Sequence, residues 1–273
     1  MLLGREEMRF DFGGAKFRLP RDKALLGWIL DQFLYGEVTG IQCGHWLYRA
    51  PSLEAAQFFA RQAVEELSHV QQFLRIYQLI GAEPRPAHPV VRFLSTGAMG
   101  QDYAEHVANE MAVGEGLVLA IFYALIDTVE DEGVVKILEA ACRQEERHVA
   151  FGEAQTRLLA EHSQALRDRL LGLNLVTLFA VDQLAQRIQR TLDREHEVLK
   201  QIPAFVAQLS AQLELRLRRM GILDRPLSEL SRPLKFWLLT KAYAGQGLRA
   251  LRPRPPLLTR TYLQDPQVRA LNK

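Results

Sequence analysis

Two copies of the pattern Glu-x-x-His-Val carry the residues best suited to chemistry in this sequence. One copy runs from Glu66 to His69 and is followed by Val70; the other runs from Glu145 to His148 and is followed by Val149. In an α-helix, residues i and i+3 lie on one face one turn apart, so each copy presents a carboxylate beside an imidazole. Carboxylate oxygen and imidazole nitrogen are ligands that suit iron and manganese. The two copies therefore indicate a metal site.

A further glutamate precedes each copy at almost the same distance along the chain. Glu37 precedes Glu66, and Glu115 precedes Glu145. With a rise of about 1.5 Å per residue, either separation lets a helical hairpin run out, turn and return to the same height. Each hairpin would then place one glutamate opposite one Glu-x-x-His motif. Four carboxylates and two imidazoles at one level are the ligands of a carboxylate-bridged dimetal site in a four-helix bundle.

The helical faces that carry these six residues are otherwise apolar. Buried carboxylates and imidazoles are costly when nothing neutralises them, and two divalent cations would offset four negative charges. A single Glu-x-x-His motif is typical of a solvated helix surface, but the repeat with its partner glutamates favours the dimetal site. Glu110 competes with Glu115, and its offset along the chain turns it about 140° around an α-helix. The matched spacings favour Glu115. The apolar neighbours on these faces include Leu30, Phe33, Phe59, Phe73, Ala108, Met111, Leu119, Phe122, Leu138, Ala141 and Val149.

The elements that must hold these residues are predicted to be helices throughout. Apolar residues recur at i, i+3, i+4 and i+7, and the helical stretches are separated by short Pro, Gly or Ser signals, so the sequence predicts an all-α fold. Glycines at 36, 40 and 44 form a stripe beside Glu37; close helix approach, a subunit interface or space for a substrate would each explain them. The expected helices cover residues 21–48, 52–80, 101–128, 132–162, 165–195, 200–220 and 227–250.

The predicted helices divide the chain into four regions. We expect an N-terminal arm, then the four-helix bundle with the dimetal site, then additional helices that pack on the bundle, and finally a Pro-rich extended tail. The corresponding residues are 1–20, 21–165, 166–250 and 251–273.

Composition and charge restrict the class of protein. With 48% hydrophobic and 24% charged residues among 273, the chain has an ordinary globular composition. Its two cysteines, Cys43 and Cys142, exclude a disulfide scaffold and suit a reducing compartment. The first residues lack a signal-peptide layout, and the longest uncharged apolar run, Gly116 to Ile126, is too short to span a bilayer. The sequence therefore predicts a cytoplasmic protein without a membrane span.

The net charge of +2 conceals an uneven distribution. Residues 201–273 contain 13 Lys and Arg against 4 Asp and Glu, so residues 1–200 are net acidic. Four of the acidic charges belong to the predicted metal site. The basic C-terminal region is either a solvated face or a docking surface for an acidic partner such as a carrier protein, a reductase or a nucleic acid. Its arginines include Arg216, Arg218, Arg219, Arg249, Arg252 and Arg254.

The six metal-site residues resemble those of the ferritin-like diiron-carboxylate proteins, of the oxygenase and ribonucleotide-reductase small-subunit type. The resemblance covers roughly residues 20–165, and the stretch His148-Val-Ala-Phe-Gly-Glu is also similar to aldehyde-deformylating oxygenases. It implies a ferritin-like four-helix bundle with additional C-terminal helices and two iron ions. Manganese, or a mixed Mn/Fe pair, is an alternative to two irons, because carboxylate and imidazole ligands suit both metals.

Within that family, the resemblance assigns a role to each ligand. Glu66 and Glu145 would bridge the two irons, whereas Glu37 and Glu115 would be terminal ligands, and His69 and His148 would each give one nitrogen. Two departures stand out. Gln144 replaces the acid that many relatives have before the second motif, which would weaken the orientation of an imidazole. Ala141 stands where some relatives carry a seventh ligand, which argues against the arylamine N-oxygenase branch.

The resemblance implies an O2-activating non-haem diiron oxidase or oxygenase that acts on a small apolar or carrier-bound substrate. The sequence contains neither a dinucleotide-binding fingerprint nor a cysteine cluster, so a separate electron donor is expected. Iron handling, as a ferroxidase or a peroxide scavenger, is the alternative, and a helical adaptor with a vestigial metal site is a third. A homodimer is left open.

Overall fold

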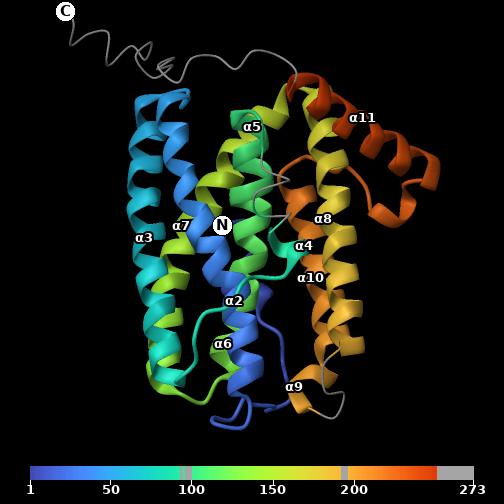
Figure 1. The fold of residues 1–273 in the computed structure, drawn as a ribbon. Helices are drawn as coiled ribbons and strands as arrows, with labels where there is room; N and C mark the ends of the chain where they lie inside the picture. The colour runs from blue at the N-terminus through green and yellow to red at the C-terminus, as the bar shows by residue number, and fades with distance from the viewer. Residues whose placement is uncertain (93–94, 96–99, 192–195, 251–273) are drawn as a thin grey trace, which may run out of the picture. The chain divides into compact units, whose positions relative to one another are not determined.

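The computed structural model describes residues 1–92, 95, 100–191 and 196–250, and these residues form an all-α protein (Figure 1). Among them there is no β-strand, and one isolated bridge joins Phe17 to Val129. The predicted all-α class is confirmed. The predicted tail, with Arg252 and Arg254, lies outside the described residues.

The described residues form two compact units: unit 1 lies within Met1–Leu26 and Met99–Arg249, and unit 2 lies within Gly27–Ala98.

The helical elements follow the predicted order, with breaks that the sequence did not indicate. The elements are α1 (Arg5–Met8), α2 (Lys23–Gly40), the 3₁₀ segment η1 (Ile41–Tyr48), α3 (Leu53–Ile80), α4 (Pro89–Arg92), α5 (Tyr103–Glu105), the π-helix η3 (His106–Glu115), α6 (Gly116–Thr128), α7 (Glu132–Glu161), α8 (Gln164–Thr191), α9 (Glu197–Lys200), α10 (Ile202–Arg219), the 3₁₀ turn η4 (Leu227–Glu229) and α11 (Arg232–Ala250).

Unit 2 is a helical hairpin of α2 and α3. The hydroxyl of Tyr77 in α3 donates to Oδ1 of Asp31 in α2 at 2.6 Å, and the rings of Phe33 and Phe73 stack with centroids 6.1 Å apart. Burial raises the pKa of Tyr77, and the hydrogen bond to Asp31 raises it further. The phenol therefore stays protonated and holds the two helices in register.

The two ends of α3 lie where the sequence predicts them. The Ser52 hydroxyl accepts a hydrogen bond from the Ala55 amide at 3.1 Å, which satisfies one of the free amides at the start of the helix. At the other end, Gly81 adopts a left-handed conformation with φ of 65°, which glycine reaches without strain. The predicted helix over 21–48 is wrong in one respect, because α2 changes to a 3₁₀ segment after Gly40. Glycine favours such a change, since it destabilises an α-helix by about 1 kcal/mol relative to alanine.

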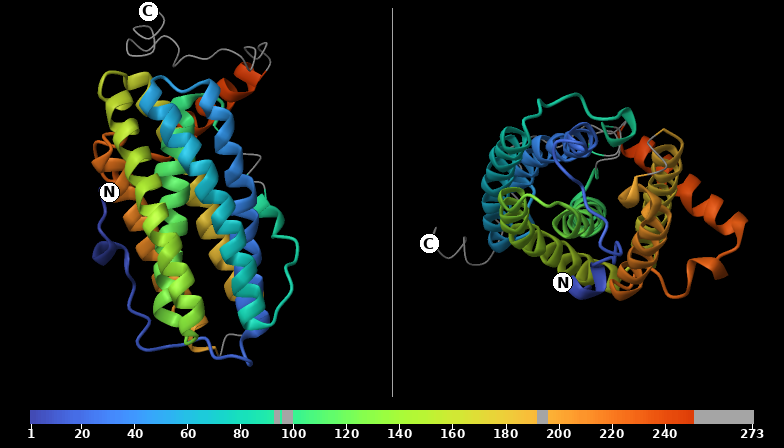
Figure 2. Two further views of the ribbon diagram at one scale, coloured as in Figure 1. Left: turned by 90° about the vertical axis from the view of Figure 1, so that its left-hand side faces the viewer. Right: turned by 90° about the horizontal axis from the view of Figure 1, so that it is seen from below.

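Unit 1 is organised around the continuous stretch α5–η3–α6. This stretch lies along α7, while α8 contacts both α7 and η3, and α10 contacts α6 and α8 (Figure 2). The helices after residue 165 share one apolar core with η3. Its members include Ala108, Ala112, Val113, Leu170, Leu171, Leu213 and Leu217.

The first twenty residues pack into unit 1. Leu3 and Met8 are fully buried, and Arg9 forms two hydrogen bonds with the carboxylate of Asp127, at 2.6 and 3.0 Å. At the other end of the unit, the Ser231 hydroxyl caps α11, which begins at Arg232 rather than at the predicted residue 227. Proline at the first turn of a helix is favourable because its amide would have no partner there, and Pro233 occupies that position.

One described helical stretch, Tyr103–Thr128, is long and apolar enough to cross a membrane by length and composition alone. Its most apolar window is 61% buried inside the protein, which is a property of core helices in soluble proteins. The absence of a membrane span stays a prediction.

Candidate metal centre

The first Glu–His triad consists of Glu37, Glu66 and His69 and lies within unit 2. Nδ1 of His69 lies 3.0 Å from Oε2 of Glu37 and 3.7 Å from Oε2 of Glu66. All three side chains are buried, and each offers one ligand atom within 4.8 Å of the others. The structure thus brings together three residues that the sequence predicts to be ligands, and it places them where one metal ion could contact two oxygens and a nitrogen.

The second Glu–His triad consists of Glu115, Glu145 and His148 and lies within unit 1. Nδ1 of His148 lies 3.5 Å from Oε2 of Glu145 and 3.9 Å from Oε2 of Glu115. Glu145 and His148 are buried, whereas the Glu115 side chain keeps 21% of its surface exposed. The second triad therefore repeats the composition of the first but has a more accessible carboxylate.

Local structure explains why each Glu-x-x-His motif faces inward. The Asp131 side chain accepts a hydrogen bond from the Val134 amide at 2.9 Å and so sets the start of α7, as Ser52 does for α3. From these caps, the apolar faces of both helices run continuously past the motifs. Glu145 and His148 lie on the buried face of α7, where both have exposures of 2% or less.

Burial makes the negative charge of each triad costly in free energy. Two carboxylates beside one imidazole, all removed from water, carry more negative charge than the imidazole can balance. A divalent cation satisfies both the charge and the lone pairs, and mixed oxygen and nitrogen ligation suits iron or manganese. The residues present therefore fit a metal ion in either triad.

The structure separates Glu115 from its competitor Glu110. Oε2 of Glu110 lies 2.6 Å from Nδ1 of His106, and its other oxygen accepts a hydrogen bond from the Gly100 amide. Both glutamates belong to the π-helix, in which hydrogen bonds run from i to i+5, so the rotation expected between them for an α-helix is wrong. Glu115 ends the π-helix and faces His148, whereas Glu110 is held by His106.

Gly40 has a role that spacing alone did not show. A β-carbon built at this position would lie 2.7 Å from Oε2 of Glu66, so the carboxylate occupies the space that any other side chain would need. Of the three glycines in the stripe, Gly36 faces open space and Gly44 would make an ordinary contact of 3.7 Å with Ala63. Close helix approach, which would explain the glycine stripe, is therefore seen at Gly40. The group that approaches it is the carboxylate of a candidate ligand.

Glu146, next to the candidate ligand Glu145, accepts a hydrogen bond from the buried phenol of Tyr123 at 2.7 Å. Burial raises the pKa of Tyr123, and Glu146 raises it further, so the phenol remains a donor. The sequence carries no signal for this pair, because the two residues lie far apart in the chain and on different helices.

The structure removes Arg216 from the predicted basic surface. Its side chain is buried, and Nε lies 3.0 Å from Oε1 of Glu153 in α7. Burial lowers the pKa of Arg216, and the Glu153 carboxylate opposes that change. The guanidinium also lies against the backbone of Gly116, the residue after Glu115. Arg216 is thus part of the core of unit 1, whereas Arg218 and Arg219 are exposed.

Comparisons of the chain with protein-family models, with curated proteins and with solved structures found no match. The functional assignment therefore rests on the two triads and on the resemblance of their residues to the ferritin-like diiron pattern.

Proposed function

We propose that the two triads together hold two iron ions within a ferritin-like four-helix bundle, and that the protein is an O2-dependent diiron oxidase or oxygenase. The observation that carries the proposal is the repetition: a pair of carboxylates beside an imidazole occurs twice, at His69 and at His148, from the same Glu and Glu-x-x-His spacing. Glu66 and Glu145 would be ligands of these ions, together with Glu37, Glu115, His69 and His148. Two ferrous ions supply electrons for the reduction of O2 when they are bound.

The chain's own residues orient the ligands and exclude water. Phe59 and Phe73 lie on the buried face of α3 on either side of Glu66 and His69, and neither is exposed. A dry, apolar surround strengthens every electrostatic interaction with the ions and protects a reactive site from solvent. Glu115 is the one accessible carboxylate among the four, and it is the ligand at which we expect exogenous molecules to approach.

We expect the substrate to be a small apolar or carrier-bound molecule, because the side chains around the candidate ligands are apolar. Electrons beyond those of the two ferrous ions must come from a separate donor. Exposed Arg218 and Arg219, together with the rest of the basic C-terminal region, offer positive charge to an acidic donor or carrier.

The test begins with metal content. The full chain, loaded anaerobically with Fe(II), is expected to hold two irons, and Glu66→Ala or Glu145→Ala is expected to leave fewer than one. Glu54→Ala in α3 and Glu161→Ala in α7 are matched controls, because both residues are exposed on the same helices. If each triad variant retained one iron, the triads would be separate sites and the shared centre would be wrong.

Oxygen reactivity is measured next. Mixing the ferrous protein with O2 is expected to produce a transient optical absorption that Glu66→Ala and Glu145→Ala abolish. Survival of the absorption in those variants would overturn the assignment. The iron-handling alternative predicts instead that iron is oxidised over many turnovers without an organic substrate and that the chains assemble into a cage, which size-exclusion chromatography would detect.

A further inference from the structure

Unit 1 contains a cavity of about 810 Å³ between α8, α10 and α11 that has no part in the candidate metal centre. Its volume lies in the range of small-molecule sites, roughly 300–1,000 Å³. None of the six candidate ligands lines it. Much of the apolar wall is made of buried side chains, which are Leu171, Ile222, Leu223, Leu230 and Leu238.

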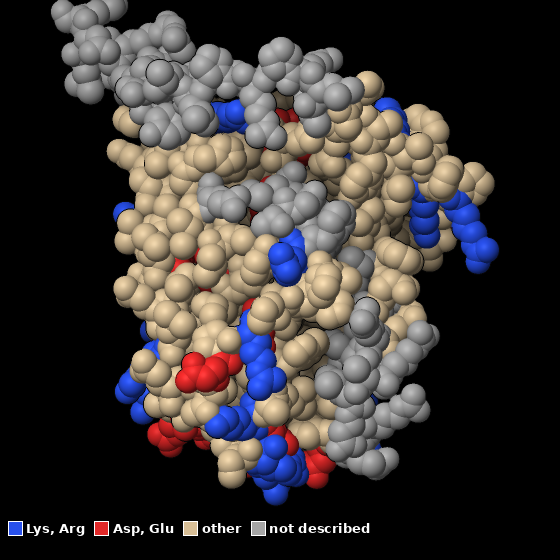
Figure 3. All heavy atoms as spheres, in the orientation of Figure 1, with Lys and Arg blue, Asp and Glu red and all other residues tan. Residues whose placement is uncertain are grey.

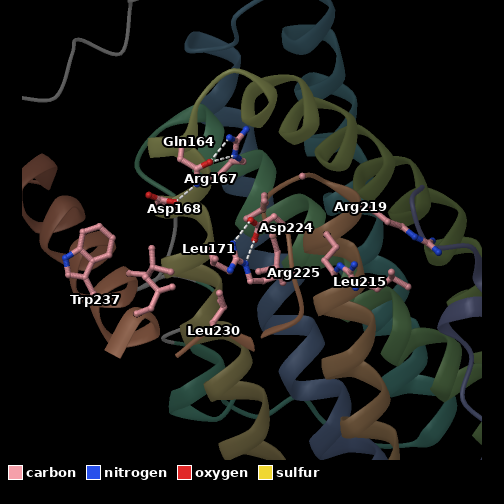
Figure 4. Close-up of a pocket in the computed structure, with 16 residues that line it drawn as sticks. Gln164, Arg167, Asp168, Leu171, Leu215, Arg219, Asp224, Arg225, Leu230 and Trp237 are labelled. Atoms are coloured by element: carbon pink, nitrogen blue, oxygen red, sulfur yellow. Dashed lines mark hydrogen bonds and ion pairs between the residues drawn. The ribbon is translucent and has the colours of Figure 1, made fainter. Parts of the chain in front are cut away.

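Arginines add positive charge to this apolar wall. Arg225 pairs with Asp224 through two contacts of 3.1 Å, and Arg219 pairs with Glu7 at 2.8 Å and points away from the leucines (Figure 4). Arg218 also lines the cavity and is exposed. Within the part of the chain that the structure describes, its guanidinium has no hydrogen-bonding or ion-pair partner, and only its backbone carbonyl accepts a hydrogen bond. Its five donors are therefore free to bind an anion from solution.

Arg167 also lines the cavity. Its guanidinium donates to Oε1 of Gln164 and to the carbonyl of Ala160, which fixes it against the start of α8 (Figure 4). Its charge also reaches Asp224, whose pKa is lowered chiefly by Arg225 and further by Arg167. The two aspartates that line the cavity, Asp168 and Asp224, thus each have a hydrogen-bonding partner in the protein, and the positive charge of Arg218 is left without one.

The mouth of the cavity is formed by α11. Trp237 is 51% exposed and Leu234 is 40% exposed, and the Lys241 ammonium lies 4.5 Å from the centroid of the Trp237 ring. Helix α11 carries no acidic residue, and Lys and Arg side chains project from it (Figure 3). Large apolar side chains exposed beside cations form a surface that an amphiphile with a negative head group would cover.

We propose that this cavity binds a single-chain anionic amphiphile such as a fatty acid. The hydrocarbon chain packs against Leu171, Leu230 and Trp237, and the carboxylate binds the guanidinium of Arg218. A guanidinium holds a carboxylate through two parallel hydrogen bonds, which a neutral head group cannot reproduce. The proposal does not depend on the diiron assignment, because the cavity and the two triads share no residue.

The full chain is titrated with sodium decanoate while tryptophan emission is followed. A saturable blue shift is expected because the ligand removes Trp237 from water, and Trp237→Phe is expected to abolish the shift. Decan-1-ol, which has the same chain without the charge, is expected to bind about tenfold or more weakly. The same titration of metal-free and iron-loaded protein is expected to give equal affinities.

Two matched pairs of variants locate the site. Arg218→Gln is expected to weaken decanoate binding about tenfold or more and to leave decanol unchanged, whereas Arg143→Gln, an equal loss of charge on the exposed face of α7, leaves both unchanged. Leu234→Glu at the mouth is expected to weaken decanoate binding, whereas Leu248→Glu, on the same helix outside the cavity, does not. Circular dichroism and urea midpoints check that the variants fold.

Three results would overturn the proposal. The first is a tryptophan response that rises without saturation, which means adventitious partition only. The second is an equal effect of Arg218→Gln and Arg143→Gln, which would mean that general charge attracts decanoate. The third is an equal affinity for decanoate and decanol, which would show that no cationic group recognises the carboxylate.

Discussion

The carboxylate of Glu66 occupies the space into which a side chain at position 40 would extend, 2.7 Å from the β-carbon that Gly40 lacks. Helix α2 changes to a 3₁₀ segment directly after Gly40, and α3 lies alongside. The glycine therefore lets a buried candidate ligand approach the neighbouring backbone, and its absence of a side chain matters to the site more than its conformational freedom.

Gly40→Ala is expected to displace the Glu66 carboxylate and to lower the affinity of the protein for Fe(II) by about tenfold or more. Gly36→Ala is the control, because a β-carbon there meets nothing within 4 Å. That variant is expected to bind iron normally and to gain up to about 1 kcal/mol of stability from helix propensity. Iron titration and thermal unfolding measure the two effects. Equal iron affinity in both variants would remove Gly40 from the site.

The buried ion pair of Arg216 and Glu153 is expected to be costly to break from either side. Arg216→Met leaves the Glu153 carboxylate buried without its cation, and we expect a loss of about 3–5 kcal/mol of unfolding free energy. The double variant Arg216→Met, Glu153→Gln removes both charges and is expected to recover most of that loss. Urea denaturation of the single and double variants completes the cycle; simple additivity of the two single losses would contradict a direct interaction.

Asp22 is expected to make stability depend on pH. Its pKa is held well below the usual range by a hydrogen bond from Arg21, with further contributions from the Arg18 amide and from His196, whose Nε2 lies 3.1 Å away. A carboxylate with a lowered folded-state pKa stabilises the protein above its ordinary pKa, and the stabilisation is lost as the pH falls through the folded-state value. Asp22→Asn is therefore expected to cost about 1–3 kcal/mol near pH 7 and progressively less below about pH 4.

Chemical denaturation across that range of pH measures the difference. The control is Asp224→Asn, because Asp224 has a lowered pKa but is exposed, and solvent screens its pairing with Arg225. A stability gap between wild type and Asp22→Asn that did not change with pH would contradict the expectation.

Cys142 is expected to resist thiol reagents until the protein unfolds. Burial raises the pKa of its thiol to about 12, and only the thiolate reacts. Near pH 8 its thiolate fraction is on the order of 10⁻⁴, so labelling by a disulfide reagent should be about a thousandfold slower than for a free cysteine. A Cys43→Ser background isolates Cys142, and labelling in guanidinium chloride gives the unfolded rate. Fast labelling of the native chain would show that the helix opens locally.

The sequence by itself determined the all-α class, the helices α3 and α7, and the positions of Glu66, His69, Glu145 and His148 along these two helices. The bounds of α3 and α7 agree with the predicted ones because capping residues and apolar spacing act within a few residues, and Glu-x-x-His is a one-turn motif. Local patterns carry this information completely.

Only the tertiary structure decided the rest. The contact of Gly40 with Glu66 and the burial of Arg216 each depend on a residue of another helix, and the π-helix that ends at Glu115 is not indicated by the spacing of its residues. The charge of Arg216 indicates a surface residue, and it is buried because Glu153 compensates it. An argument from residue spacing assumes a regular α-helix, and an argument from charge assumes a side chain in water. Both assumptions fail where packing against another helix stabilises the protein by more than the local preference of the residue opposes it.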